Sequence, residues 1–312
     1  MHYAVIGAGA VGGTIGGRLF QSGHDVTLIA RGRHYEALRE QGLRLVTPDC
    51  DERLSVPVAE GPVDADVLVV ATKSQDTIAA LESWPGEAPV VCAQNGVANE
   101  RMVLRRFEQV YGMCVYLPAL HMEPGVVAAF GSPLSGQLHI GRYPQGVDEL
   151  SRTMADDLSK SAFGALAVSD VMRWKYGKLL GNLGNAVEAL CGRDPGITEL
   201  FEQARAEGVA VLAAAGIEHQ QGEPIALMPI EGVERGGGSS WQSLARGTGS
   251  IEADYLNGEI VLLGRLHGVA TPVNEVLQRE AGRAARERRA PGSMTVGELS
   301  SLIAERSSAV SR

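Results

Sequence analysis

Apolar residues in the first half of the chain come in short runs, separated by segments with the apolar spacing of amphipathic helices. This alternation is typical of an α/β domain built around a parallel sheet. In the second half, apolar positions recur every three to four residues over long stretches, which predicts helices. The predicted strands are Tyr3–Ile6, Asp25–Ile29, Val67–Ala71, Pro89–Ala93 and Met113–Tyr116, and the predicted helices are Arg173–Cys191, Thr198–Ala215 and Ser250–His267.

Two further apolar segments follow the predicted strands. Val126–Phe130 and Gln137–Gly141 are separated by a cluster of glycine, serine and proline residues. Such clusters are typical of turns, so the pattern predicts a hairpin that closes the sheet. The change to helical spacing comes near residue 168. We therefore expect an α/β domain over residues 1–168 and a helical domain over residues 169–312.

The first predicted strand runs directly into Gly7-Ala8-Gly9-Ala10-Val11-Gly12, a G-x-G-x-x-G motif. After a strand, the first glycine takes the tight turn, the second admits backbone N–H groups to a pyrophosphate, and the third lets the next helix pack closely. A structural glycine turn is the alternative, because 39 of the 312 residues are glycine. The position directly after a strand favours a dinucleotide-binding loop, formed by Gly7, Ala8, Gly9, Ala10, Val11 and Gly12.

The residue that ends the second predicted strand indicates which dinucleotide binds. Proteins that bind NAD usually place a carboxylate about 20 residues beyond the glycines, where it accepts hydrogen bonds from the ribose. Here the strand ends Ile29-Ala30-Arg31, with Arg33 close by. A guanidinium suits a 2′-phosphate, so Arg31 favours NADP. The alternative is that Arg31 is a solvated loop residue.

Composition excludes several classes of partner. The net charge of −9 leaves no excess of basic residues for nucleic acid or for an anionic membrane surface. No apolar run reaches the roughly 18 residues of a membrane span, and a strand begins with the first residues, so we expect a cytoplasmic protein without a leader. The four cysteines lack metal-ligand spacing and predict neither a zinc site nor a disulfide framework.

Polar side chains follow two of the predicted strands. Lys73 comes after Val67–Ala71, and Asn95 comes after Pro89–Ala93. Ligands of open parallel sheets bind beyond the carboxyl ends of the strands. Lys73 is therefore a candidate to meet a phosphate or a substrate carboxylate, and Asn95 to bind ribose or substrate. A surface lysine and an ordinary Asn-Gly turn are the alternatives.

One predicted helix in the second half carries a polar stripe. Lys178, Asn182 and Asn185 are spaced i, i+4 and i+7, which places them on one side of a helix, while the leucines between them lie on another. A partly desolvated lysine can donate a proton near neutral pH, as the reduction of a ketone requires. A solvated polar face is the alternative, although asparagine is a poor helix former.

Taken together, these motifs resemble ketopantoate reductases over nearly the whole chain. The motifs that carry the resemblance, in chain order, are the glycine loop with Arg31, the Lys73 turn, Gln94-Asn95-Gly96, the Lys178 helix, Ser239-Ser240, and Glu252-x-Asp254-Tyr255-Leu256-Asn257-Gly258. The resemblance implies a Rossmann-type dinucleotide-binding domain joined to an all-helical domain like the C-terminal domain of 6-phosphogluconate dehydrogenase. It also implies that NADPH and a small 2-keto acid bind in the cleft between the domains.

The same resemblance implies a reaction and a role for each residue. NADPH would reduce 2-dehydropantoate to pantoate, a step toward pantothenate and coenzyme A. Lys178 would be the general acid, and Glu252 would hold the substrate hydroxyl and shape the surroundings of the lysine. The substrate would bind Asn95, Asn182 and Ser240, and the 2′-phosphate side of the cofactor would bind Arg31 and Lys73. A homodimer is a possible assembly.

One position departs from the family pattern. The second asparagine normally follows the lysine by eight residues, whereas here Asn185 follows Lys178 by seven and position 186 is alanine. We expect Asn185 to bind substrate with an altered aim, which leaves open a different 2-keto acid as the substrate. Lys175 is a nearby competitor for the role of general acid. A non-catalytic NADP sensor is a further alternative, but it would need neither Lys178 nor Glu252.

Overall fold

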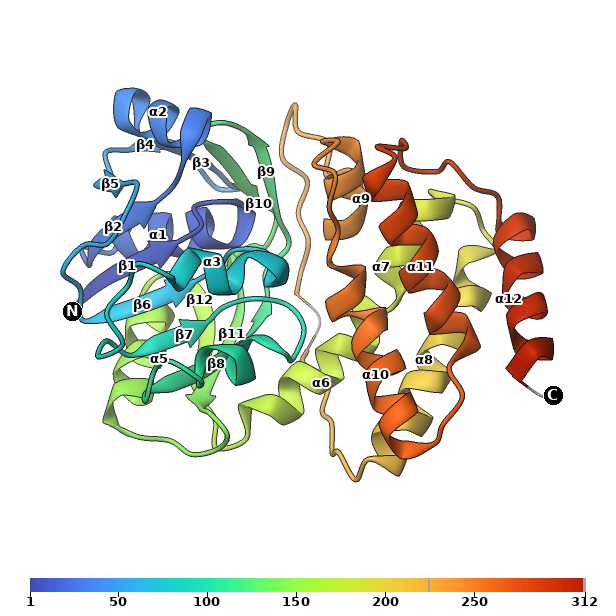
Figure 1. Ribbon diagram of the computed structural model, residues 1–312. Coiled ribbons are helices and arrows are strands. Elements are labelled where there is room, and N and C mark those ends of the chain that lie inside the picture. Colours follow the sequence, from blue (N-terminus) through green and yellow to red (C-terminus); the bar gives the residue numbers. More distant parts are fainter. Residues whose placement is uncertain (224, 311–312) are drawn as a thin grey trace. The chain divides into compact units, whose positions relative to one another are not determined.

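The computed structural model describes residues 1–223 and 225–310, and it divides into two compact units (Figure 1). Unit 1 comprises Met1–Lys175 and Gln221–Arg235, and unit 2 comprises Tyr176–Gln220 and Gly236–Arg312. The units divide inside a helix, α6 (Val171–Asn182), whereas the expected domain boundary at residue 168 lies just before that helix begins. Unit 1 also contains a later segment of the chain, Gln221–Arg235, which a single domain boundary cannot describe.

Unit 1 is built on a sheet of eight strands in the order β12-β11-β8-β7-β6-β1-β2-β5. All neighbouring strands are parallel except β8 and β11. The strands are β1 (His2–Ile6), β2 (Asp25–Ile29), β5 (Val58–Ala59), β6 (Val67–Val70), β7 (Val90–Cys92), β8 (Val110–Tyr116), β11 (Gly136–Arg142) and β12 (Phe163–Ala167). The five strands predicted from the apolar runs are all present, and the mixed α/β class is confirmed.

A second sheet in unit 1, with the order β4-β3-β10-β9, was not predicted. Its strands are β3 (Leu43–Val46), β4 (Asp51–Leu54), β9 (Ala119–Glu123) and β10 (Val126–Ala129). The predicted hairpin is therefore wrong: β10 pairs with β9 and β3, while β11 pairs with β8 and β12 in the large sheet. Both strands are apolar because each is buried, β10 in the small sheet and β11 in the large one. The turn-like residues between them connect the two sheets.

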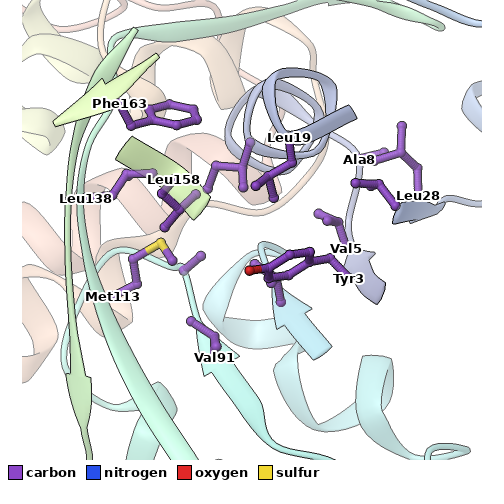
Figure 2. Close-up of a cluster of buried hydrophobic side chains, with 14 of the residues drawn as sticks. Tyr3, Val5, Ala8, Leu19, Leu28, Val91, Met113, Leu138, Leu158 and Phe163 are labelled. Carbon is purple, nitrogen blue, oxygen red and sulfur yellow. The ribbon is translucent and has the colours of Figure 1, made fainter. Parts of the chain in front are cut away.

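Helix α1 (Ala10–Gln21) packs against both sheets through its glycines. A Cβ on Gly16 would lie 2.5 Å from Leu28 in the large sheet, and a Cβ on Gly13 would lie 2.9 Å from Val127 in the small sheet. On the other side of the core, buried Met113, Leu158 and Phe163 fill the space beside the large sheet (Figure 2). The remaining helices within unit 1 are α2 (Gly32–Gln41), η1 (Ser74–Asp76), α3 (Thr77–Leu81), α4 (Asn99–Val103) and α5 (Glu149–Lys160).

In its described residues, unit 2 is helical. Its helices are the second half of α6, α7 (Gly184–Cys191), α8 (Ile197–Ala214), α9 (Ser239–Ala245), η2 (Glu252–Tyr255), α10 (Asn257–His267), α11 (Pro272–Arg286) and α12 (Val296–Val310). None of the helices in the described part of the chain has the length and apolar character needed to span a membrane.

The helix predicted over Arg173–Cys191 is two helices, because α6 ends at Asn182 and α7 begins at Gly184. Asn257 donates a side-chain hydrogen bond to Leu183 O at the break. A Cβ on Gly184 would lie 2.8 Å from the Phe201 ring, so this glycine lets the start of α7 pack closely on α8. Side-chain contacts from elsewhere in unit 2 thus support a break that helical periodicity does not reveal.

Candidate functional site

The Gly7–Gly12 loop joins β1 to α1 in a shape that suits a bound pyrophosphate. Gly7 turns the chain with a φ of +97°, and its N–H donates to Ile29 O at 3.0 Å. A Cβ on Gly12 would lie 2.1 Å from Gly7 O, so only glycine lets α1 start this close to the loop. A Cβ on Gly9 would meet nothing within 4 Å. The loop is therefore open at Gly9, where backbone N–H groups can approach a phosphate.

A cavity of about 350 Å³ opens at this loop, entirely within unit 1. Its lining combines the glycine loop with the ends of β1, β2 and β5, the start of α2 and the segment around α3. The residues are Ile6, Gly7, Ala8, Gly9, Ile29, Ala30, Arg31, His34, Glu60, Gly61, Thr72, Asp76, Ala79, Ala80, Ser83 and Trp84. Glycine N–H groups, one guanidinium and apolar walls fit the adenosine and diphosphate parts of a dinucleotide.

Arg31 lines this cavity from the position just before α2, and its side chain is exposed. Lys73 and Asn95 do not belong to the described lining, although Lys73 follows the lining residue Thr72. Both are half-buried and stand in the loops after β6 and β7. The structure thus places Arg31 at the cavity, with Lys73 and Asn95 in the two neighbouring loops.

Buried hydrogen bonds join the loop after β6 to the loop after β7. Asn99 Nδ2 donates to Asn95 O at 3.0 Å and to Ser74 Oγ at 3.2 Å. Thr77 Oγ1 donates to Asn99 Oδ1 at 2.9 Å, and Gln94 Nε2 donates to Thr77 Oγ1 at 2.7 Å. These hydrogen bonds hold the backbone on both sides of the predicted binding residues.

Lys175 forms a buried ion pair with Glu100, which directly follows Asn99. The two side chains are only 2% and 0% exposed. This buried contact ties the first half of α6 to α4. Lys175 is therefore committed to a structural contact and is poorly suited to deliver protons to a substrate. Lys178 is left as our candidate for the general acid.

Lys178 and Asn182 lie one turn apart on α6 and are both half-buried. The Nδ2 atom of Asn182 is buried and has no hydrogen-bond partner among the described residues. An unsatisfied buried amide is costly, so such a group often marks a place where a ligand supplies the missing acceptor. The Asn182 amide and the Lys178 ammonium, four residues apart on one helix, are together the kind of pair that can hold a polar substrate.

Asn185 lies at the start of α7, beyond the α6–α7 break at Leu183. There it faces the triple-glycine segment before α9: a Cβ on Gly238 would lie 3.3 Å from Asn185 Oδ1. Glu188, one turn further along α7, accepts the Gly238 N–H at 2.8 Å. The segment leading to buried Ser240 is thus brought to Asn185, and a side chain on Gly238 would crowd this contact.

The second predicted catalytic residue, Glu252, begins η2 and is buried. A buried carboxylate is retained in proteins when it has polar or charged partners. Asn257, from the same sequence motif, is also buried and bonds both Leu183 O and Asn274 Oδ1. This stretch therefore contributes a candidate functional carboxylate as well as the side chain that supports the α6–α7 break.

Sequence reasoning missed most of the cavity lining, including His34 and Glu60. His34 stands three residues after Arg31, and Glu60 directly follows β5. The spacing of His34 from Arg31, three residues across the start of one helix, was a usable signal. Glu60 offered none, because β5 is only two residues long and its pairing with β2 is a tertiary contact.

Comparison with known proteins gives the same assignment for both halves of the chain. The family model described as ketopantoate reductase PanE/ApbA matches residues 3–145. The model described as the C-terminal part of the same family matches residues 170–283.

Individual relatives match over nearly their whole length. A 2-dehydropantoate 2-reductase from Archaeoglobus fulgidus is 30% identical over 283 residues, covering 88% of this chain and 94% of the relative. The crystal structure of a ketopantoate reductase of the PanE/ApbA family from Ralstonia eutropha has a TM-score of 0.78 and 29% identity, covering 93% of this chain and 100% of that one. A D-mandelate dehydrogenase solved with NADH and anilino(oxo)acetate has a TM-score of 0.79 at 23% identity, with coverage of 93% and 100%, a likeness of fold.

Proposed function

The chain belongs to the ketopantoate reductase family, and from this membership we propose that it reduces 2-dehydropantoate to pantoate with NADPH, in the synthesis of pantothenate. A relative named for that reaction covers 88% of this chain, and the family model for the C-terminal part matches residues 170–283, which include Lys178 and Glu252. The observation that carries the cofactor part of the proposal is the cavity at the glycine loop, with Arg31 in its lining. A guanidinium there favours a 2′-phosphate, and hence NADPH over NADH.

When bound, NADPH supplies the hydride for the carbonyl carbon of the keto acid. The chain then has to bind the carboxylate, orient the carbonyl and deliver a proton to its oxygen. We assign the proton to Lys178 Nζ, which becomes neutral as the alcohol forms. In the proposal, Glu252 holds the substrate hydroxyl and shapes the surroundings of Lys178. Hydrogen bonds to the substrate come from Asn95, Asn182, Asn185 and Ser240, and Lys73 joins Arg31 on the cofactor.

Replacing Lys178 by alanine tests the assignment. Loss of a general acid typically costs about 10²- to 10⁴-fold in rate. We expect K178A to lose at least that much in kcat for 2-dehydropantoate, measured by NADPH oxidation, with its NADPH Kd unchanged. Lys160 at the exposed end of α5 provides the matched control, and K160A should keep full activity.

Substrate and cofactor panels separate this proposal from its alternatives. Wild-type protein should turn over 2-dehydropantoate faster than other 2-keto acids, and NADPH faster than NADH. Faster turnover of a different 2-keto acid would identify that acid as the substrate. Asn185, whose spacing from Lys178 departs from the family pattern, would then be the first residue to test for the change in specificity. Binding of NADPH without turnover of any keto acid would favour the sensor alternative. Full activity of K178A would instead overturn the assignment of Lys178 as the general acid.

We include a cytoplasmic homodimer in the proposal. Leu262 and Leu266 are 46% and 68% exposed and lie one turn apart on α10, where they offer an apolar stripe to a second copy. Light scattering on wild-type protein and on the L262E/L266E variant measures the assembly. A dimer that persists unchanged in the variant would exclude this surface.

A further inference from the structure

His34 on α2 contacts the glycine loop from the side of the cavity. Its Nε2 atom lies 2.7 Å from Ala8 O, and its Nδ1 atom lies 2.9 Å from the backbone nitrogen of Gly125. The ring is half-buried and belongs to the cavity lining together with Ala8 and Gly9. One imidazole thus connects the loop that we assign to the pyrophosphate with the turn between β9 and β10.

The two contacts fix where the ring carries its proton. Gly125 can only donate, since a backbone N–H has no acceptor capacity, so His34 Nδ1 is the acceptor. Ala8 O can only accept, so His34 Nε2 carries the hydrogen and donates it. Burial lowers the pKa of His34, which favours this neutral form. His121 packs edge-on against the ring, at a centroid distance of 4.7 Å, and helps to hold its plane.

Anchoring Ala8 O has a consequence for the next residue. In a planar trans peptide, the carbonyl of one residue and the N–H of the following residue point in opposite directions. A fixed Ala8 carbonyl therefore fixes the direction of the Gly9 N–H. Gly9 is the residue before α1, whose first N–H groups lack partners within the helix and form the anion-binding end.

We propose that His34 is a positioning residue that orients the Gly9 N–H toward the cofactor pyrophosphate. The inference rests on the proposed function for the identity of the ligand. It also gives the small sheet a role. Gly125 is held in turn, because Arg44 N–H on β3 donates to Gly125 O at 2.8 Å. The small sheet thus supports the phosphate-binding loop through a chain of three hydrogen bonds, at Arg44, Gly125 and His34.

The test compares ligands with and without a pyrophosphate. His34→Phe keeps the ring volume and removes both hydrogen bonds, whereas His34→Gln retains a donor that can reach Ala8 O. Calorimetric titration measures the Kd of NADPH and of adenosine 2′-monophosphate, which lacks the pyrophosphate. Because a hydrogen bond to a charged group is worth a tenfold or larger change in affinity, we expect H34F to raise the NADPH Kd by about tenfold or more. The Kd of adenosine 2′-monophosphate should not change, and H34Q should recover most of the NADPH affinity.

Controls separate orientation from folding and from the proposed function. His2→Phe makes the same chemical change in a histidine that bonds Thr27 Oγ1 and does not belong to the cavity lining, so H2F should bind both ligands like wild type. Equal loss of both ligands in H34F, or unchanged NADPH affinity, would overturn the role of His34. Failure of wild-type protein to bind NADPH would instead overturn the proposed cofactor.

Discussion

Arg31 and Glu60 bring opposite charges to the lining of the glycine-loop cavity. The register places them together, because Val58 and Ala59 on β5 pair with Leu28 and Ile29 on β2, so Glu60 leaves the sheet beside the residues that lead to Arg31. A carboxylate at the end of this edge disfavours a ligand that carries a 2′-phosphate, since like charges repel. Arg31 and Glu60 should therefore pull cofactor preference in opposite directions.

We expect E60Q to bind NADPH about two- to fivefold more tightly, as removal of one like charge near an exposed phosphate is worth up to about 1 kcal/mol. NADH binding should weaken or stay unchanged. Titration of both cofactors at low and high salt measures the effect, which screening should reduce. E36Q, an exposed acidic residue on α2 outside the described lining, is the control. Equal changes for the two cofactors would show that Glu60 does not discriminate them.

Single residues differed in how far sequence could place them. Arg31 was predictable because it follows a strand at a fixed distance from the glycine motif, and the cavity lining includes it. The unpartnered amide of Asn182 and the ion pair of Lys175 with Glu100 were not, because both depend on contacts between segments far apart in the chain. The roles of Lys178 and Glu252 stay predictions.

At the scale of elements, helix α6 contains two glycines in opposite surroundings. A Cβ on Gly177 would lie 1.9 Å from Gln220 O, a backbone atom that cannot move alone. A Cβ on Gly181 would meet nothing within 4 Å, and this residue is exposed. Gly177 is thus required by close packing, whereas Gly181 only weakens the helix.

Alanine at these two sites should have effects of opposite sign. Gly181→Ala should stabilise the protein by roughly 0.5–1 kcal/mol, the usual gain in a helix interior. Gly177→Ala should destabilise it by about 1–3 kcal/mol, as forced overpacking does. Thermal unfolding midpoints of the two variants and wild type provide the comparison. A shift of the same sign in both would mean that the Gln220 backbone moves aside and packing does not decide the outcome.

Helices and strands were predictable where the spacing of their apolar residues reflects burial in a single layer of the fold. Five of the eight strands in the large sheet followed from apolar runs, and the helix predicted over Thr198–Ala215 corresponds to α8. The hairpin failed because β10 and β11 are both apolar for separate reasons, one in each sheet. The α6–α7 break failed because Asn257, from another part of the chain, bonds the carbonyl at the break. In both cases the deciding partner was distant in sequence.

At the scale of the whole molecule, the half-buried His34 and the buried His139 make stability depend on pH. Burial lowers the pKa of both His34 and His139 from the usual 6.5. His34 faces His121, with Arg31 and Glu60 in the same cavity lining; His139 packs against Trp174, and Glu223 is the nearby charge that opposes its shift. Below pH 6.5 these two histidines bind protons more readily in the unfolded chain than in the folded protein, so the free energy of unfolding decreases as the pH drops.

We expect the thermal unfolding midpoint to decrease when the pH is lowered from 7.5 to 5.5. The decrease should exceed the contribution of the carboxylates, since carboxylates protonate mainly at lower pH. His139→Phe should reduce this fall, because phenylalanine keeps the edge-on contact with Trp174 and cannot bind a proton. Compared with wild type, H139F should retain up to about 1 kcal/mol more of its free energy of unfolding for each pH unit, the contribution of one histidine. His267→Phe, at an exposed site on α10, should leave the pH dependence unchanged. An H139F variant with the wild-type slope would contradict the assignment to His139.

The packing of α1 between two sheets bears on how this protein can be engineered. Gly13 and Gly16 face opposite sheets, and a Cβ on Gly17 would lie 3.0 Å from Leu43 of the small sheet, so the helix after the phosphate loop has little freedom to accept new side chains. Libraries that aim to switch the cofactor should therefore leave the first turns of α1 unchanged. The variable positions belong at the ends of β2 and β5, where Arg31 and Glu60 are exposed and can be exchanged without repacking a core.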